Sequence, residues 1–559
     1  ALSALQQRGQ KRQIQLWTAQ EPNPDVLLWD RSLSDGRFRQ GSLYVHLDPA
    51  DLQSPQLQLQ VAMVLAQTQP APLGPLLLHC GGPGSGADCI GSAVTDDFKG
   101  FDVWSISQRG IGPGAEPALL CNSSKLPSAC PDSGCKVSDF TDCPCALPNG
   151  MPEIGEIWAD VDPRNETQVR SLLEYTQAWS KRCAASDKFQ LVGKDGKVFN
   201  FLEYVGTQLL AQDIDRLRQA IGAERMNLYG YSYGTYVAGV YATAFSEVTG
   251  KVVLNGNMMP VPRKVLQATG DAGANDKFLA KLFANCHSFP SNCSLKEPEQ
   301  QFEEIVAAAR SGELTAKTRS GKTFSLTVGM LMAFLQYMST PASGRGYAIA
   351  TKTLALLSSS SSNASEREKT VAWILDGFCT VQWNATWYNF DVCIGPGHTQ
   401  VEGEGASFGE PYLNQISVWG IDQAGFYDVA DLMRQWHRAS QDYSEAGLAA
   451  YVGDMAGFFL WPLRATPNAP IGSPNVQALI VGNLFDTATS YAWSQEMRRS
   501  FPSGSMITWQ GVGHTLPSRS SSKDIHACTA HVMEYLLNGT LPLDGFVCRA
   551  HQPVPVGLL

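Results

Sequence analysis

The sequence predicts an α/β fold: a mostly parallel central sheet, helices on both of its faces and a large, mainly helical insertion. Short, continuously apolar runs at residues 74–80, 101–107 and 226–229 have the pattern of strands that are buried on both faces. Stretches of helical periodicity separate these runs, and this alternation is typical of a parallel sheet. The buried-strand pattern returns at residues 476–482, after a long stretch that is mainly helical.

Composition limits the classes of protein to which the chain can belong. Its 559 residues exceed the usual size of one hydrophobic core, and 44% apolar with 17% charged residues is an ordinary globular composition. The formal net charge of −10 argues against nucleic acid as a partner, because a face that binds nucleic acid is basic. No apolar run reaches the roughly 20 residues of a membrane span. We therefore expect neither nucleic acid binding nor a membrane span.

The order of these patterns predicts three parts. Residues 1–260 form the first part of the sheet core, residues 261–470 the helical insertion, and residues 471–559 the second part of the core. Within the first part, residues 121–165 hold Cys130, Cys135, Cys143 and Cys145 among many Pro, Gly and Ser, and we expect a disulfide-tied excursion.

Finer patterns predict the individual elements. Alternation over residues 38–66 predicts two antiparallel strands, and residues 251–257 and 505–510 have strand patterns. Helices are predicted at residues 167–183, 202–221, 235–245, 276–284, 297–309, 328–338, 346–357, 428–439, 489–500 and 524–537.

Residues 226–246 are the stretch around which the chain is organised. An apolar strand leads into Gly230-Tyr231-Ser232-Tyr233-Gly234, and helical periodicity follows. A serine on such a sharp strand-to-helix turn is strained, and its neighbours two positions away must be glycine for strand and helix to approach. The turn presents the Ser232 hydroxyl as a nucleophile and the Tyr233 amide as a hydrogen-bond donor beside it.

A second match to the same pattern needs to be weighed. Gly405-Ala406-Ser407-Phe408-Gly409 follows residues that do not form a strand pattern and leads into Glu410-Pro411, which we expect to be a poor helix start. Context therefore favours Ser232 over Ser407.

A serine nucleophile needs a base and a group that orients the base. His514 comes directly after the strand pattern at 505–510, in a glycine-rich turn, whereas His526 and His531 fall within the following helix pattern. Asp486 follows the strand pattern at 476–482 and is the candidate acid, although an aspartate there could instead cap the next helix. The chain order Ser232, Asp486, His514 is that of α/β-hydrolases.

Glycine-rich loops follow the first two buried strands, at residues 81–86 and 108–112. Neither has the Gly-Lys-Ser/Thr or the Gly-x-Gly-x-x-Gly signature of a nucleotide site. Their backbone N–H groups fit an oxyanion hole better. The cysteine spacings and the lack of nearby histidines do not fit structural zinc, so we expect no cofactor and no metal.

Cysteine usage indicates an oxidising compartment. The chain has 14 cysteines, and short-range pairs are Cys286 with Cys293, Cys379 with Cys393, and Cys528 with Cys548. N-glycan acceptor patterns occur at Asn122, Asn165, Asn292, Asn363, Asn384 and Asn538. We therefore expect a secreted or extracellular protein, or one of a vacuolar or lysosomal lumen. Because the first residues do not have the pattern of a signal peptide, we expect that the sequence is that of a processed form.

Several motifs resemble the secreted tripeptidyl aminopeptidase and prolyl aminopeptidase group of α/β-hydrolases. They are Cys80-Gly81-Gly82-Pro83-Gly84, residues 107–112, residues 230–236, residues 482–489, residues 511–514 and the closing stretch from Cys528 to Cys548. The resemblance covers both ends of the sheet core, and in the insertion it is limited to Trp461-Pro462. The chain departs from the pattern of this group in two ways. It has Cys80 where His or Asn is typical, and it lacks the cysteine that usually precedes the Trp-Pro pair.

The resemblance implies roles for individual residues. Ser232 would attack a carbonyl carbon, His514 would move the proton, Asp486 would orient the imidazole, and the amides of Tyr233 and Gly82 would hold the oxyanion. The resemblance also implies an exopeptidase whose carboxylates recognise the free α-amino group of the substrate. The candidates in the insertion, none preferred, are Asp376, Asp391, Glu402, Glu404 and Glu410.

We therefore expect a secreted serine hydrolase, an aminopeptidase that releases single residues or di- or tripeptides through an acyl-enzyme on Ser232. One alternative is an esterase or lactonase that acts on a small apolar compound, because fold does not fix substrate. An alternative of another class is a catalytically silent, hydrolase-like binding protein. The expected partner is a peptide or small-molecule substrate, and the sequence does not indicate an oligomeric state.

Overall fold

A ten-stranded sheet forms the centre of the computed structural model. The structure describes residues 27–29, 37–84, 86–87, 89–90, 98–112, 115–119, 121, 161–317, 323–339, 345–360, 362–383, 386–389, 410–463, 468–516 and 523–549. The strands in spatial order are β1 (Leu27–Trp29), β2 (Phe38–His46), β3 (Gln56–Val64), β5 (Asp102–Ile106), β4 (Pro75–His79), β8 (Met226–Tyr231), β9 (Thr249–Asn255), β14 (Ala478–Phe485), β15 (Ser505–Val512) and β16 (Phe546–Cys548).

The sheet is mostly parallel, as the sequence predicts. The strands from β5 to β16 in this order pair in parallel, whereas β1, β2, β3 and β5 pair antiparallel. Parallel strands place their carboxyl ends on one edge, and loops at that edge carry the site in open α/β sheets. The short strand β16 follows the last predicted helix and was not expected from the sequence.

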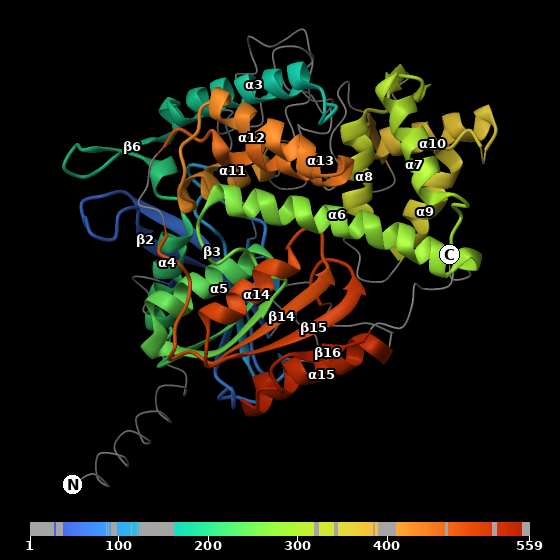
Figure 1. Ribbon diagram of the computed structural model, residues 1–559. Helices are drawn as coiled ribbons and strands as arrows, with labels where there is room; N and C mark the ends of the chain where they lie inside the picture. Colours follow the sequence, from blue (N-terminus) through green and yellow to red (C-terminus); the bar gives the residue numbers. More distant parts are fainter. Residues whose placement is uncertain are drawn as a thin grey trace, which may run out of the picture.

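Alternate residues of the central strands enter two separate apolar cores, because successive side chains of a strand point to opposite faces. One core contains Leu77, Leu228, Leu254 and Ile480, and the other contains Leu78, Tyr229, Val253 and Val481. The helices α3 (Glu166–Ala184), α4 (Thr207–Ala220), α5 (Tyr233–Ala244) and α14 (Tyr491–Ser500) contribute to the first core, and α15 (Lys523–Asn538) contributes to the second. Helices therefore cover both faces (Figure 1).

Between β9 and β14 the chain forms a set of helices that we call the insertion helices. They are α6 (Lys264–Ser288), α7 (Pro298–Arg310), α8 (Val328–Ser339), α9 (Arg345–Leu357), α10 (Ala364–Cys379), α11 (Glu410–Asp422), α12 (Val429–Asp442), α13 (Glu445–Asp454) and a π-helical turn, η7 (Met455–Phe459). The small strand pairs β6 (Gln190–Val192) with β7 (Val198–Asn200), β10 (Thr315–Lys317) with β11 (Thr323–Ser325), and β12 (Thr380–Trp383) with β13 (Thr386–Asn389) lie outside the main sheet. The three-part division by residue number remains a proposal.

Helix α6 places the insertion helices against the sheet. It crosses above β14 and β15 in Figure 1. The Lys281 ammonium lies 5.2 Å from the ring centre of Phe485, the last residue of β14. The Gly270 position on α6 packs directly against Trp493 of α14, so a Cβ there would lie 2.0 Å from the indole Nε1. The carboxyl end of β14 is therefore covered by α6.

Two details of the predicted helices were wrong. The helix expected at residues 276–284 is the middle of the 25-residue α6. Glu410-Pro411, expected to be a poor helix start, begins α11, and proline is tolerated in the first turn of a helix, where its missing N–H would have no intrahelical partner. Ser407 lies outside the described residues.

Disulfides include two of the three predicted pairs. The structure has Cys286–Cys293 and Cys528–Cys548, together with Cys80–Cys89 and Cys121–Cys183, which were not predicted. The third predicted pair involves Cys393, which lies outside the described residues, as do Cys130, Cys135, Cys143 and Cys145. No helix in the described part of the chain is long and apolar enough to cross a membrane.

The predicted glycan acceptors fall in varied settings. Asn165, Asn363 and Asn538 are exposed, and Asn292 is half-buried. Asn122 and Asn384 lie outside the described residues. Glycosylation of all six stays a prediction.

A buried ion pair fixes the loop after β5. The Arg109 guanidinium donates to Asp213 of α4 at 2.8 and 2.9 Å and to the carbonyl oxygen of Leu47 at 2.7 Å. Both side chains are almost fully buried. Replacement of one partner would leave the other charge buried without compensation.

We predict that Asp213→Asn lowers the free energy of unfolding by about 3–5 kcal/mol. The matched control is Glu166→Gln, which removes an exposed i,i+4 partner of Arg170 and should cost less than about 1 kcal/mol. Urea unfolding followed by tryptophan fluorescence measures both. Equal, small losses in the two variants would contradict the importance of the buried pair.

Candidate active site

The Ser232 turn has the strained geometry that the sequence predicts. Ser232 lies between β8 and α5 with φ 55° and ψ −129°, a backbone conformation that costs energy for a residue with a side chain. A Cβ on Gly230 would lie 2.2 Å from the carbonyl oxygen of Gly234, and a Cβ on Gly234 would lie 2.2 Å from that of His79. Both glycines are therefore required for the strand and the helix to approach this closely.

Asp486 and His514 meet at the carboxyl ends of β14 and β15. The imidazole Nδ1 lies 3.1 Å from each carboxylate oxygen of Asp486. The Asp486 side chain is fully buried, while that of His514 is 21% exposed. The sequence prediction that these two residues come together is therefore met by their geometry.

Asp486 accepts further hydrogen bonds besides its contact with His514. Its oxygens accept from the backbone N–H of Ala488 at 2.9 Å, of Thr489 at 2.8 Å and of Thr515 at 3.1 Å, and from the Thr489 hydroxyl at 2.8 Å. The amides of Ala488 and Thr489 belong to the loop before α14, whose N-cap is Ser490, so the alternative role of Asp486 as the cap of that helix is wrong. A carboxylate that only accepts favours the proton on Nδ1, which leaves Nε2 as a base.

Asn255, the last residue of β9, connects Ser232 to the His514 loop. Its carbonyl oxygen accepts from the Ser232 N–H at 3.0 Å. Its side chain bonds both backbone groups of Leu516, at 2.7 and 2.8 Å, two residues after His514. A single buried amide therefore holds the serine turn and the histidine loop against each other.

The loop after β4 lies against Ser232 on the other side. A Cβ on Gly81 would lie 2.8 Å from the Ser232 Cβ, and Gly81 and Gly82 have φ of 106° and 103°. Gly82 is exposed. Cys80, the departure from the related group, forms a disulfide with Cys89 and thereby closes this loop.

His79 supports that loop and was not found by sequence reasoning. It is buried, and burial lowers the pKa of its imidazole to about 4. The neutral ring accepts from the Gly81 N–H at Nδ1, at 3.2 Å, and packs edge-on against Tyr233. In the sequence, His79 is the last residue of a buried strand, and this position predicts only a core residue.

Two further acids lie near Asp486. Like His79, they were not found from the sequence, where each is only a single charged residue among apolar ones. Asp271 of α6 and Asp454 at the end of α13 share a hydrogen bond. Burial raises the pKa of Asp271 well above its usual range, and the carboxyl groups of Asp454 and Asp486 add to this increase. One turn further along α6, the Asn275 amide donates to the carbonyl oxygen of Thr487 at 3.3 Å. The acid pair therefore lies above the Asp486 loop.

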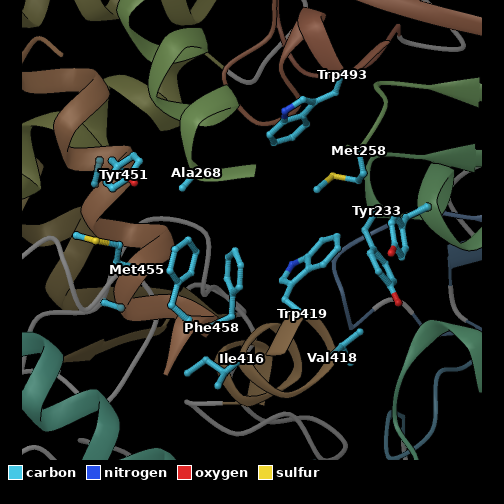
Figure 2. Close-up of a cluster of buried hydrophobic side chains, with 14 of the residues drawn as sticks. Tyr233, Met258, Ala268, Ile416, Val418, Trp419, Tyr451, Met455, Phe458 and Trp493 are labelled. Carbon is cyan, nitrogen blue, oxygen red and sulfur yellow. The ribbon is translucent and has the colours of Figure 1, made fainter. Parts of the chain in front are cut away.

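An apolar cluster adjoins this acid pair. Figure 2 shows Trp419 of α11 between Phe458 of η7 and Tyr233, with Met258 and Trp493 nearby. The Trp419 ring lies edge-on to Tyr233, with ring centres 4.9 Å apart. Ala268 and Tyr451, which belong to the same cluster, are each one helical turn before Asp271 and Asp454. The acids expected from the resemblance, Asp376, Asp391, Glu402, Glu404 and Glu410, have side chains outside the described residues.

Comparison with known families agrees with this architecture. A family model described as alpha/beta hydrolase fold matches residues 74–295, and one described as TAP-like protein matches residues 459–548. The protein has the α/β-hydrolase fold and is similar to the TAP-like group.

The relatives that the chain resembles in sequence include two peptidases and an esterase. The serine protease Hip1 of Mycobacterium tuberculosis is 22% identical over 497 residues, which are 85% of this chain and 81% of that protein. The tripeptidyl aminopeptidase of Streptomyces lividans is 22% identical over 538 residues, 91% and 83% of the two chains. Carboxylesterase B of M. tuberculosis is 24% identical over 534 residues, 89% and 85%. These names support a serine hydrolase and leave the substrate to be proposed.

We predict that Gly81→Ala lowers the rate of reaction at Ser232 by about 100-fold, because the added methyl displaces the nucleophile. Gly196→Ala is the matched control: it also has positive φ, 83°, but a Cβ there meets no atom within 4 Å. The rate of labelling by a fluorophosphonate measures the effect. Equal rates in both variants would contradict the close approach of Gly81 to Ser232.

Proposed function

We propose that this hydrolase is a serine aminopeptidase that releases short pieces from peptide N-termini through an acyl-enzyme on Ser232. The observation that carries the proposal is the Asp486–His514 pair, held by Asn255 beside the strained Ser232 turn. A serine, a base and an orienting carboxylate in this order are the requirements of acyl transfer. The names of the Hip1 and tripeptidyl aminopeptidase relatives support a peptide as the substrate.

Each step follows from the proposed roles. The Ser232 oxygen bonds to the carbonyl carbon of the peptide while its proton passes to Nε2 of His514. The amides of Tyr233 and Gly82 donate to the oxyanion that forms. The carbon–nitrogen bond then breaks, and the imidazolium gives its proton to the leaving amine. Water repeats the sequence at the ester, which frees the N-terminal fragment and restores Ser232.

The Asp271–Asp454 pair supports the choice of a free N-terminus. Hydrogen-bonded carboxyl groups that share a proton gain from a nearby cation, because a positive charge favours their ionised form. The Oδ1 atom of Asp271 is buried and accepts no hydrogen bond from the described residues. An α-ammonium group would supply both the missing donor and the missing charge. The adjoining apolar cluster fits the side chains of a short N-terminal fragment.

We predict that Ser232→Ala, His514→Ala and Asp486→Asn each lower kcat by about 10⁴-fold or more, because the three residues act as a unit. Tripeptidyl and single-residue p-nitroanilides with free N-termini are the substrates, and circular dichroism checks that the variants fold. Wild-type turnover by His514→Ala would contradict the proposed base.

A second prediction concerns the Asp271–Asp454 pair. Asp271→Asn and Asp454→Asn should raise KM for p-nitroanilides with free N-termini by about tenfold, near 1.4 kcal/mol of binding. Their kinetics on neutral aryl esters should change little. Asp442→Asn, an exposed acid on α12, is the matched control. Since only the ionised carboxylate attracts the ammonium, KM for free-amine substrates should fall as pH rises through the raised pKa of Asp271, until the substrate amine loses its proton.

The alternative function, an esterase, has one supporting observation, the carboxylesterase B relative. Substrates with acetylated N-termini, tested beside aryl esters, separate the two functions. Preferential cleavage of free N-termini supports the aminopeptidase. Fast ester hydrolysis with equal or absent cleavage of free and blocked peptides would establish the esterase instead.

A further inference from the structure

A buried carboxylate of the insertion helices caps a helix of the sheet core. Asp422, the last residue of α11, is buried, and burial raises the pKa of its carboxyl group to about 7. Its Oδ1 accepts from the Thr207 N–H at 2.8 Å, at the first residue of α4. The residue before, Gly206, has no side chain with which to cap α4, and a Cβ there would lie 2.9 Å from the Asp422 carboxylate. The capping group is therefore supplied by a distant segment.

Hydrogen bonds continue from this carboxylate to the serine turn. The Thr207 hydroxyl donates to Oδ2 of Asp422 and also contacts the Tyr233 hydroxyl. Because the only hydrogen of the Thr207 hydroxyl goes to Asp422, the Tyr233 hydroxyl must donate to Thr207. The Tyr233 oxygen can then accept, and it receives the side-chain amide of Gln108 at 3.1 Å.

Gln108 completes the connection to the loop that faces Ser232. Its carbonyl oxygen Oε1 accepts from the backbone N–H of Gly84. Gln108 lies two residues after the end of β5 and is buried. All donors in the series point the same way, from Gly84 through Gln108, Tyr233 and Thr207 to Asp422. Such a one-directional series is mutually strengthening, and it depends on an acceptor at its end.

The series touches both sides of the proposed oxyanion hole. The Tyr233 amide is one proposed donor, and the loop from Gly81 to Gly84 carries the other. We propose that Asp422 is a positioning residue, which sets the oxyanion hole through the hydroxyls of Thr207 and Tyr233 and the amide of Gln108. The inference rests on the proposed acyl transfer at Ser232 but not on the choice of a peptide as substrate.

Helix α5 offers a matched control for this series. Tyr236 is one turn after Tyr233, is equally buried, and bonds through its hydroxyl to Asn468 at 3.3 Å. Tyr236→Phe removes a buried hydroxyl from the same helix and keeps every member of the series, as well as the hydrogen bond from Asn468 to Asp422. Tyr233→Phe removes the hydroxyl of the series while it keeps the backbone amide.

The test is the second-order rate constant for inactivation by a fluorophosphonate, whose phosphoryl oxygen occupies the oxyanion hole. We expect Tyr233→Phe, Thr207→Val and Asp422→Asn to slow inactivation at least tenfold, with Tyr236→Phe within twofold of wild type. Thr207→Ser restores the hydroxyl and should recover most of the rate. With an aryl ester, the three variants should lose kcat with little change in KM.

Thermal unfolding of every variant separates positioning from a loss of fold. Wild-type inactivation rates in folded Tyr233→Phe and Thr207→Val would overturn the proposal, as would an equal loss in Tyr236→Phe or a failure of Thr207→Ser to recover. A wild-type protein that the probe does not label at Ser232 would overturn the serine hydrolase itself. Labelled wild-type protein that cleaves no free N-terminus would overturn only the aminopeptidase.

Discussion

The close contact of three backbone segments around Ser232 is the constraint on which the site depends. β8 turns into α5 within one strained residue, and this is possible because Gly230, Gly234 and Gly81 carry no Cβ that would collide with the neighbouring backbone or with Ser232. The strain is held by surrounding bonds, above all the Ser232 N–H to Asn255. The serine hydroxyl is thereby placed at the carboxyl edge of the parallel strands, where the loops after β14 and β15 bring the acid and the base.

The insertion helices cover this edge of the sheet. α6 covers the end of β14, and Asp422 of α11 accepts a hydrogen bond from the first residue of α4. Acidic side chains of the insertion thus lie near the site at two places. The Asp271–Asp454 pair lies above Asp486, and Asp422 is the last acceptor in the series of hydrogen bonds that begins at the glycine loop. Substrate recognition and oxyanion geometry would then both depend on how these helices pack on the sheet.

The sequence was sufficient where a local pattern determines the structure. Strands buried on both faces, the glycine-flanked serine and the loops after β14 and β15 each follow from a few adjacent residues, so the sheet and the meeting of Asp486 with His514 could be predicted. Asp271, Asp454 and Asp422 could not, because their surroundings come from distant segments. The start of α6 was missed since Gly270 and Gly273 weaken its helical pattern, and the Cys80–Cys89 pair was missed because Cys80 reads as the end of a buried run.

A crystal structure of the wild-type protein inactivated by a fluorophosphonate would test the central claim most directly. The account predicts one covalent bond, from Ser232 Oγ to phosphorus, with the phosphoryl oxygen about 2.7–3.1 Å from the amide nitrogens of Tyr233 and Gly82. It also predicts the imidazole of His514 within hydrogen-bond reach of Ser232 Oγ. An adduct on another residue, or a phosphoryl oxygen that faces solvent with His514 out of reach, would contradict it.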